Sequence, residues 1–365
     1  VLLDNTEMPI ASLSPPRSGP HLDRLWEARG GVIRRSLELV KLAAYALLSM
    51  FHARSLRGVQ DNTQFVDKHD VLLFSVIRNE SARIPYFLDY YRSIGVDHFF
   101  FIDNGSTDDF AATVAECPDV SVWYTEASYR KANCGLHWSN ALMRRHADRH
   151  WALLVDPDEF LVFPYDDRRN LKELTSFLDS EGRRSLFCIL VDMYGAGSFD
   201  DAYCRAGENP LDVCPYFDAA GYTQKYNPVY QNIWVQGGVR QRVFFREAPE
   251  SAPALNKIPL VKWRWVYSYI SSTHIVLPTH LNEPHAEAHL SPTGALLHFK
   301  LMSSLREKAE EEMVRGEHFG GSVEYRSYLQ TIGQEDRSLM FADSVLYQDW
   351  RQLEALGLLN RGQWF

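Results

Sequence analysis

The chain has 365 residues, 45% of them hydrophobic, which is enough apolar side chain for one large domain or two closely joined ones. Its 38 basic and 47 acidic residues give a formal net charge of −9. No general positive field attracts phosphate backbones, which excludes a general nucleic-acid binder, and no nucleic acid is expected as a partner. The 5 cysteines form no C-x-x-C pair and are too scattered for a disulfide framework, which favours free thiols in a reducing compartment.

Residues 1–68 differ in composition from the rest of the chain. A Pro/Ser-rich leader, MPIASLSPPRSGPH, precedes an amphipathic segment over residues 33–51. One helical face of that segment holds Leu37, Val40, Ala44, Leu47 and Phe51. Residues 21–60 carry seven Lys/Arg against three Asp/Glu, as in a helix on an anionic membrane, although a helix packed on the protein's own core has the same periodicity. With no run of about 18 uncharged apolar residues, we expect no transmembrane helix.

From Asp70 onward, short apolar runs alternate with helical patterns. The predicted strands cover residues 71–77, 98–103, 120–126 and 151–156. The predicted helices cover residues 81–95, 106–117 and 135–148, the first beginning with Ser81 as its N-cap and ending at Gly95. Continuous apolar strands that alternate with helices predict an α/β fold with a mostly parallel central sheet and helices on both faces.

The pattern beyond Phe163 is mixed. A predicted helix over 170–181 and a predicted strand over 184–194 lead to a loop region that reaches about residue 230. After it come three apolar segments and a charged helical region, over residues 237–245, 256–263, 294–300 and 303 onward. No linker is evident after Asp70, so we expect the second half to pack against the first as one body.

Polar side chains follow the predicted strands at the points where they end. These polar segments are residues 78–80, 103–108, 125–131 and 156–160. In α/β sheets of this kind, ligands bind outside the carboxyl ends of the strands. The sequence therefore predicts a ligand site along one edge of the sheet.

The segment WALLVDPDEF places carboxylates directly behind an apolar strand. Asp156 and Asp158 flank a proline that we expect to hold the backbone extended, so that both side chains converge on one divalent cation. Oxygen ligands suit Mg²⁺ or Mn²⁺. The alternative is a surface turn, because Asp-Pro-Asp is good turn chemistry. Placement on the same edge as Asp103 and Asn79 favours the metal site.

Six stretches resemble one family when taken in order. They are SVIRNESARIPYFLDYYRSIGVDHFFFIDNGSTDD, NCGLHWSNAL, WALLVDPDEFLVFP, GGVRQRVFF, NKIPLVKW and GALLHFK. From Asp70 to the C-terminus the chain resembles the glycosyltransferase family 2-like group, including the bacterial relatives of family 92 (formerly DUF23). The resemblance implies a GT-A, Rossmann-like fold. Its nucleotide-binding half would cover 69–165 and its acceptor-binding half 166–300, followed by a helical extension over 301–365.

The resemblance also implies roles for residues along the predicted edge. Asn79, Glu80 and Asp103 would line the nucleoside pocket of a sugar nucleotide, with Arg78 beside them. Asp156 and Asp158 would hold a metal that bridges the diphosphate. The N-x-G-x-x-x-x-x-N stretch before the acidic strand is echoed by Asn133, Gly135 and Asn140, which adds Asn133 to the donor-binding set.

Three later residues complete the predicted site. His298 follows a short apolar strand, and a late histidine in many GT-A enzymes completes the metal shell; a structural histidine is the alternative. Lys300 and Arg240 are candidate clamps for the diphosphate, since cations of this kind contact phosphate. Solvated or ion-paired surface charges are equally compatible with their positions.

The catalytic base is not identified by the resemblance. Family 2 members usually invert the anomeric centre, which requires a base for the acceptor hydroxyl. Asp192 is the first candidate because it ends another apolar strand, and Glu159 and Asp218 are the others.

The sequence thus favours a metal-dependent, inverting glycosyltransferase of the hexosyltransferase class. It would use Mn²⁺ or Mg²⁺ to move a sugar from a UDP- or GDP-sugar to a glycan or lipid-linked envelope acceptor, as in polysaccharide or lipopolysaccharide biosynthesis. A nucleotidyltransferase is the first alternative, but RNESAR lacks the glycines of a triphosphate loop. The second is a noncatalytic sugar-nucleotide or glycan-binding protein, which retention of both Asp156 and Asp158 disfavours. The expected location is the cytoplasm, with peripheral contact to the inner face of the membrane through residues 33–51.

Overall fold

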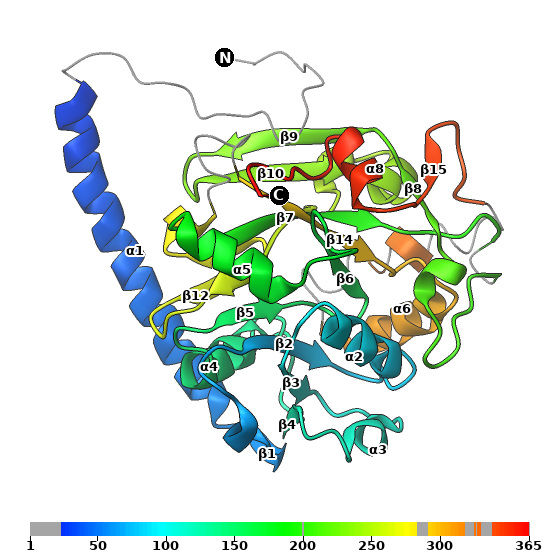
Figure 1. The fold of residues 1–365 in the computed structure, drawn as a ribbon, viewed down its shortest axis with the longest axis horizontal. Helices are drawn as coiled ribbons and strands as arrows, with labels where there is room; N and C mark the ends of the chain where they lie inside the picture. Colours follow the sequence, from blue (N-terminus) through cyan, green and yellow to red (C-terminus); the bar gives the residue numbers. More distant parts are fainter. Residues whose placement is uncertain are drawn as a thin grey trace.

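A computed structural model describes residues 23–198, 201–282, 291–317, 325, 327–329 and 338–364, with the backbone alone for 23–35 (Figure 1). The predicted Pro/Ser-rich leader lies outside the described residues. A mixed sheet of nine strands runs through the molecule. Its order is β1 (Arg57–Gln60), β4 (Val120–Tyr124), β3 (His98–Asp103), β2 (Val71–Ile77), β5 (Trp151–Leu154), β11 (Asn256–Lys262), β7 (Ser185–Asp192), β14 (Gly294–His298) and β6 (Glu159–Val162).

The centre of the sheet is parallel. Strands β4, β3, β2 and β5 pair in parallel, as do β7 and β14. Strand β11 runs antiparallel between β5 and β7, and the edge strands β1 and β6 are antiparallel to their neighbours. The predicted mostly parallel central sheet is therefore confirmed as the core of a larger mixed sheet.

The remaining elements surround this sheet. The helices are α1 (Asp23–Ala53), α2 (Ile84–Ser93), α3 (Phe110–Val114), α4 (Leu136–His146), α5 (Leu171–Ser180), α6 (Ser304–Arg315) and α8 (Trp350–Ala355). Three small antiparallel pairs are formed by β8 (Tyr216–Asp218) with β15 (Ser344–Leu346), β9 (Tyr222–Asn227) with β10 (Asn232–Gly237), and β12 (Ser268–Ser271) with β13 (Ile275–Leu277).

Helices cover both faces of the sheet. Consecutive side chains of a strand point to opposite faces. On β3, Phe101 contacts Phe87 of α2, with ring centroids 6.2 Å apart. Its neighbour Phe100 contacts His146 of α4 at 5.3 Å. Helices α2 and α4 therefore pack on opposite faces, and α1 packs against α4 (Figure 1).

Local sequence signals indicated the start of one helix correctly and that of another wrongly. Asn170 and Glu173 form a reciprocal capping box that fixes the start of α5. The predicted Ser81 N-cap is wrong, because α2 begins at Ile84 with Arg83 as its N-cap and Pro85 in its first turn. The backbone N–H of Ser81 instead donates to Asp108 at 2.8 Å, which ties this residue to the loop after β3.

The C-terminal region is more than the predicted helical extension. Strand β15 pairs antiparallel with β8, so part of this region belongs to a small sheet. Trp350 of α8 packs on Tyr165, with ring centroids 4.7 Å apart. Trp350 and Trp364 both belong to the core cluster that includes the central strands. The described C-terminal residues therefore pack as part of the main body.

His137 on α4 supplies a prediction about acid stability. Its ring is buried and stacks on His52, with centroids 5.0 Å apart. Burial, with the nearby His52, lowers the pKa of His137 to about 4, whereas an unfolded histidine titrates near 6.5. Its contribution to the free energy of unfolding is therefore full above about pH 6.5 and is lost as the pH falls toward about 4.

We expect the His137→Gln protein to show a weaker pH dependence of stability in this window. Urea unfolding of both proteins at about pH 7.5 and 5 measures the difference, which should not exceed about 1.4 kcal/mol per pH unit. Comparing slopes cancels any constant effect of the substitution itself. Equal slopes in the two proteins would contradict the prediction.

Candidate functional site

The carboxyl ends of six strands meet at one edge of the sheet. Strands β2, β3, β4, β5, β7 and β14 all run toward this edge, and the antiparallel strands β11 and β6 begin there. The chain order of the parallel strands reverses between β2 and β5, because β3 and β4 lie on one side of β2 and β5 on the other. Such a switch point is where α/β sheets bind ligands.

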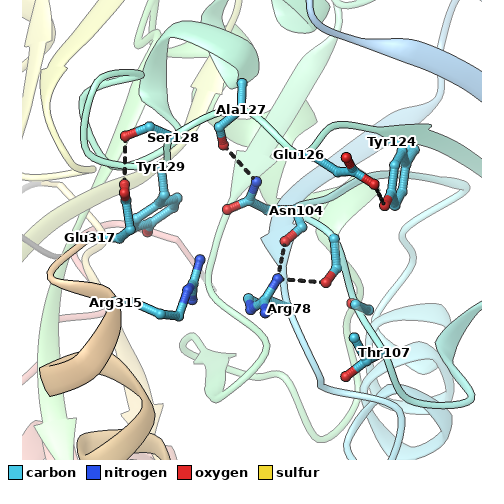
Figure 2. Close-up of a pocket in the computed structure, with 12 residues that line it drawn as sticks. Arg78, Asn104, Thr107, Tyr124, Glu126, Ala127, Ser128, Tyr129, Arg315 and Glu317 are labelled. Carbon is cyan, nitrogen blue, oxygen red and sulfur yellow. Dashed lines mark hydrogen bonds between the residues drawn. The ribbon is translucent and has the colours of Figure 1, made fainter.

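A pocket of about 430 Å³ opens beyond the ends of β2, β3 and β4 (Figure 2). Its lining comes from the loops after these strands, from the end of α6 and from the residues just beyond it. The lining residues are Arg78, Asn104, Gly105, Ser106, Thr107, Tyr124, Glu126, Ala127, Ser128, Tyr129, Arg315 and Glu317. The pocket is rich in hydroxyl, amide and guanidinium groups, which suits a polar ligand.

Arg78 and Arg315 face each other across this pocket (Figure 2). The Arg78 guanidinium donates to the carbonyl oxygens of Asn104 (2.8 Å) and Gly105 (2.5 Å), and its Nε pairs with Glu311 of α6 at 3.0 Å. Gly105 has a φ of +70°, and a Cβ there would lie 3.1 Å from Arg78 Nη1. The glycine therefore permits the close approach that fixes Arg78.

The opposite wall of the pocket holds a carboxylate. Glu317 accepts hydrogen bonds from Ser128 Oγ at 2.6 Å and from the backbone N–H of Arg130 at 2.9 Å. Burial would raise the pKa of Glu317, but these hydrogen bonds lower it. This wall therefore presents a carboxylate, which suits a hydroxyl or amide donor of a ligand.

The predicted acidic pair lies in a short crossing segment. Only residues 155–158 join β5 to β6, although these strands lie four positions apart in the sheet. The predicted extended backbone is wrong: Glu159 N donates to Asp156 O at 3.0 Å, which closes a turn. The turn leaves the Asp156 side chain exposed and that of Asp158 18% exposed.

A buried ion pair lies next to this turn and holds it in place. Glu159 is 1% exposed, and its Oε1 lies 2.9 Å from Lys257 Nζ at the start of β11. Its Oε2 accepts the backbone N–H of Asp156 at 3.3 Å. Burial alone would lower the pKa of Lys257, but the charges of Glu159 and Asp156 raise it. Glu159 therefore fixes the acidic turn and is itself neutralised by Lys257.

His298 connects the acidic turn to a second buried pair. Its Nδ1 lies 2.6 Å from Asp192 Oδ1, and its Nε2 lies 3.6 Å from Asp158 Oδ2. The other oxygen of Asp192 accepts from Arg240 Nε at 2.7 Å. Parallel pairing of β14 with β7 sets His298 opposite Asp192, which explains the contact.

Each charge in this cluster stabilises the ionised form of its neighbours. Burial alone would lower the pKa of His298, but the charge of Asp158 and its contacts with Asp158 and Asp192 raise it to about 9. Burial would raise the pKa of Asp158, yet His298 and then Arg83 and Lys308 lower it well below its usual range. Asp158 is therefore a carboxylate surrounded by positive charge.

Asp156 has the opposite environment. Burial within the domain and the charge of Glu159 raise the pKa of Asp156. Its side chain is nevertheless exposed to solvent. We therefore attribute the direction of the shift mainly to the neighbouring carboxylates of Glu159 and Asp158. A cation bound at this turn would relieve that repulsion.

A group of cations lies beside Asp158. Glu80 pairs with Arg83 at 3.0 Å and with Lys308 of α6. Arg83 also donates to the carbonyl of Phe299, just past the end of β14. Burial and the charge of Arg83 lower the pKa of Lys308. Arg83 and Lys308 thus place two cationic groups against the acidic turn.

The residues present fit a hard cation held by few protein ligands. Asp158 presents an oxygen toward His298 Nε2, which would bind a cation in exchange for its proton. His298 is oriented by a carboxylate on its other nitrogen, as metal-binding histidines are. Within the described part of the chain, no group of three or more His, Cys, Asp or Glu side chains converges as a metal cage. Mg²⁺ and similar ions are commonly bound by one or two carboxylates together with substrate phosphates and water.

In the structure, the predicted donor-binding residues have different partners and do not all reach the pocket. Only Arg78 lines the pocket. Asn79 accepts from the backbone N–H of Thr107 at 2.8 Å, and Asp103 from that of Ser106 at 2.8 Å, so both shape the loop that lines it. Other predicted residues have partners elsewhere: Glu80 with Arg83 and Lys308, Asn133 with the carbonyl of Ile270, Arg240 with Asp192, and Lys300 over the rings of Tyr325 and Tyr328.

All three candidate bases are buried and ion-paired. Asp192 contacts Arg240 and His298, and although burial raises its pKa, the Arg240 charge and then His298 lower it. Glu159 pairs with Lys257, and Asp218 with Arg242 Nε at 3.0 Å. A base must reach the proton that it removes. This geometry favours Asp192 and Glu159 as residues that position His298 and the acidic turn.

Several residues of the site were not predicted. They come from four separate parts of the chain: Arg83, Tyr129, Lys257, and the α6 region with Lys308, Arg315 and Glu317. The one usable local signal was the lysine within the apolar segment NKIPLV, because a strand lysine with apolar neighbours needs a buried partner. Comparison with protein-family models finds none that matches this chain, and comparison with curated proteins finds no match.

Proposed function

We propose that the protein is a metal-dependent, inverting glycosyltransferase with the GT-A arrangement, which transfers a sugar from a nucleoside diphosphate sugar to a glycan or lipid-linked acceptor. The observation that carries the proposal is the position of two subsites on one sheet edge, at its switch point. One is a polar pocket, and the other is an accessible Asp-Pro-Asp turn with His298 and cationic side chains beside it.

The pocket suits the nucleoside. Hydroxyl and amide groups of its lining match the edge of a base and the ribose hydroxyls. Tyr129 connects the two subsites, because it lines the pocket while burial and the charge of Asp156 raise its pKa well above the usual value. A nucleoside in the pocket would therefore extend its diphosphate toward the acidic turn.

The acidic turn and its cations suit the diphosphate. A metal held by Asp158 and His298, with the exposed carboxylate of Asp156 on the same turn, would neutralise the charge that grows on the departing diphosphate. Arg83 and Lys308, which flank Asp158, add fixed positive charge for phosphate oxygens. Asp192 keeps the His298 ring in one orientation, and the Glu159–Lys257 pair holds the turn in place.

Ligand binding can be tested by thermal unfolding. We expect UDP- or GDP-sugars with Mn²⁺ to raise the melting temperature by several degrees at saturating concentration, because a ligand that binds only the folded state stabilises it. CMP- and dTDP-sugars serve as comparison donors. The same mixtures are assayed for release of the nucleoside diphosphate, with and without a set of glycan acceptors.

The two readouts separate the alternatives. Stabilisation together with metal-dependent release of nucleoside diphosphate supports a transferase. Stabilisation without turnover on any acceptor supports a binding protein instead. Release of inorganic pyrophosphate from a nucleoside triphosphate and a sugar phosphate would identify a nucleotidyltransferase and overturn the proposal.

A further inference from the structure

Helix α1 turns its apolar side chains away from the protein. Leu37, Val40, Leu47 and Phe51 are each between 59% and 68% exposed. Four of the five residues predicted from the sequence to form one apolar face are these same residues, and the fifth, Ala44, is also exposed. The alternative that this face packs on the protein's own core is therefore wrong.

The hydrogen bonds and ring contacts between α1 and the domain come from polar and aromatic side chains. Glu38 Oε1 accepts from the backbone N–H of Thr279 at 2.5 Å, and the Tyr45 hydroxyl donates to the carbonyl of Ile270 at 3.3 Å. His52 stacks on His137. A surface helix of a soluble protein has the reverse arrangement, with its apolar stripe toward the core. In α1 the apolar stripe faces outward instead. An apolar environment outside the domain would cover it.

Charges around the outer face point to an anionic partner. Between residues 36 and 57 the only acid is Glu38, which faces inward. Lys41, Arg54 and Arg57 are exposed. Residues 21–60 carry a surplus of four positive charges in a chain whose net charge is −9. An apolar strip bordered by cations is the composition of a helix at a lipid interface.

We propose that α1 docks this protein on an anionic bilayer and lies in the plane of its surface. Leu37, Val40, Leu47 and Phe51 would enter the interface, while Lys41 and Arg54 would contact lipid phosphates. A second copy of the chain is a poorer occupant, because pairing two such faces would bring like charges together. Figure 1 shows α1 along one side of the molecule, where a flat surface could reach it.

The in-plane orientation follows from the contacts of the inner face. By length and composition alone, the helix over Ser36–Ala53 could cross a membrane, although no transmembrane helix was expected from the sequence. However, Glu38, Tyr45 and His52 bind the domain along the same stretch. A crossing helix would bring these polar contacts and their domain surface into hydrocarbon, at a high cost. One apolar face is sufficient for an interfacial helix.

Sedimentation with vesicles tests this proposal on the full chain, independently of any transferase activity. We expect the protein to pellet with vesicles of phosphatidylcholine that contain about a quarter phosphatidylglycerol, and to be released by alkaline carbonate. The double variant Val40→Glu/Leu47→Glu should bind at least about tenfold more weakly. Leu346→Glu, at another exposed apolar residue, should bind like the unmodified protein.

Four results would overturn the proposal. They are no sedimentation with anionic vesicles, unchanged binding of the double variant, resistance of the bound protein to carbonate extraction, and a lipid-free dimer that the double variant dissociates. Carbonate resistance would indicate a crossing helix, and the dimer would identify a second copy as the occupant. Because both substituted residues are exposed, circular dichroism and thermal unfolding should show a folded double variant.

Discussion

Asp158→Asn should reduce metal-dependent release of nucleoside diphosphate by at least about a hundredfold, while the protein stays folded. The amide keeps the size of the side chain but removes the negative charge that faces His298 and the guanidinium of Arg83. Loss of even an outer partner of a metal site costs about 10- to 100-fold, and loss of a direct ligand should cost more. The measurement is turnover of the donor identified by thermal unfolding, at increasing Mn²⁺ concentration.

A matched carboxylate tests whether the effect is local. Asp167→Asn removes an acid that pairs with Arg351 at 2.8 Å and is 43% exposed. Asp167 follows β6, which runs away from the edge that holds the acidic turn. Its turnover should equal that of the unmodified protein, since exposed pairs contribute little. If Asp158→Asn keeps its turnover and Mn²⁺ dependence, the acidic turn is not the metal site. Recovery at high Mn²⁺ would instead support weakened metal binding.

Local patterns were sufficient for the parallel strands of the first half of the sheet. The predicted strands over 71–77 and 98–103 match β2 and β3 residue by residue. Both are continuous apolar runs, and burial on both faces accounts for that composition. Knowing that these strands are parallel was enough to place their polar ends on one edge. The edge, and with it Arg78 and the acidic turn, could therefore be predicted from the sequence.

The partners across that edge could not be predicted in the same way. His298 meets Asp192 because β14 pairs in register with β7, and it lies opposite Glu159 because β6 pairs on its other side. Neither register can be recognised from the local sequence. Arg315 and Glu317 reach the pocket from a region predicted only as a charged helical extension. Long-range packing, rather than residue type, decided which charges the site contains.

The orientation of α1 shows a related limit. Its periodicity predicted an amphipathic helix correctly, but two environments suit the same pattern. The inner face could be recognised only from its partners, such as the carbonyl of Ile270 and the backbone N–H of Thr279. These contacts are distant in the chain, so the sequence left the two alternatives open.

The second large effect concerns stability. Lys257→Met should lower the free energy of unfolding by about 3–5 kcal/mol, because it leaves the Glu159 carboxylate buried without its counter-charge. Lys262→Met is the matched control on the same strand. Lys262 pairs with Asp179 at 2.6 Å, but both side chains are about a third exposed, so its loss should cost no more than about 1 kcal/mol. Urea unfolding measures both changes.

A double substitution separates the charge from the packing. In Lys257→Met/Glu159→Gln no buried charge remains at this pair, so more than half of the lost stability should return. The amide can still accept the backbone N–H of Asp156, the bond that Glu159 makes at 3.3 Å, so the acidic turn should keep its support. If the double variant is as unstable as Lys257→Met alone, the loss comes from lysine packing rather than from the buried carboxylate of Glu159 that is left unpaired. If it recovers stability and also keeps turnover, Glu159 serves the turn through its hydrogen bond, and its charge is needed only to match Lys257.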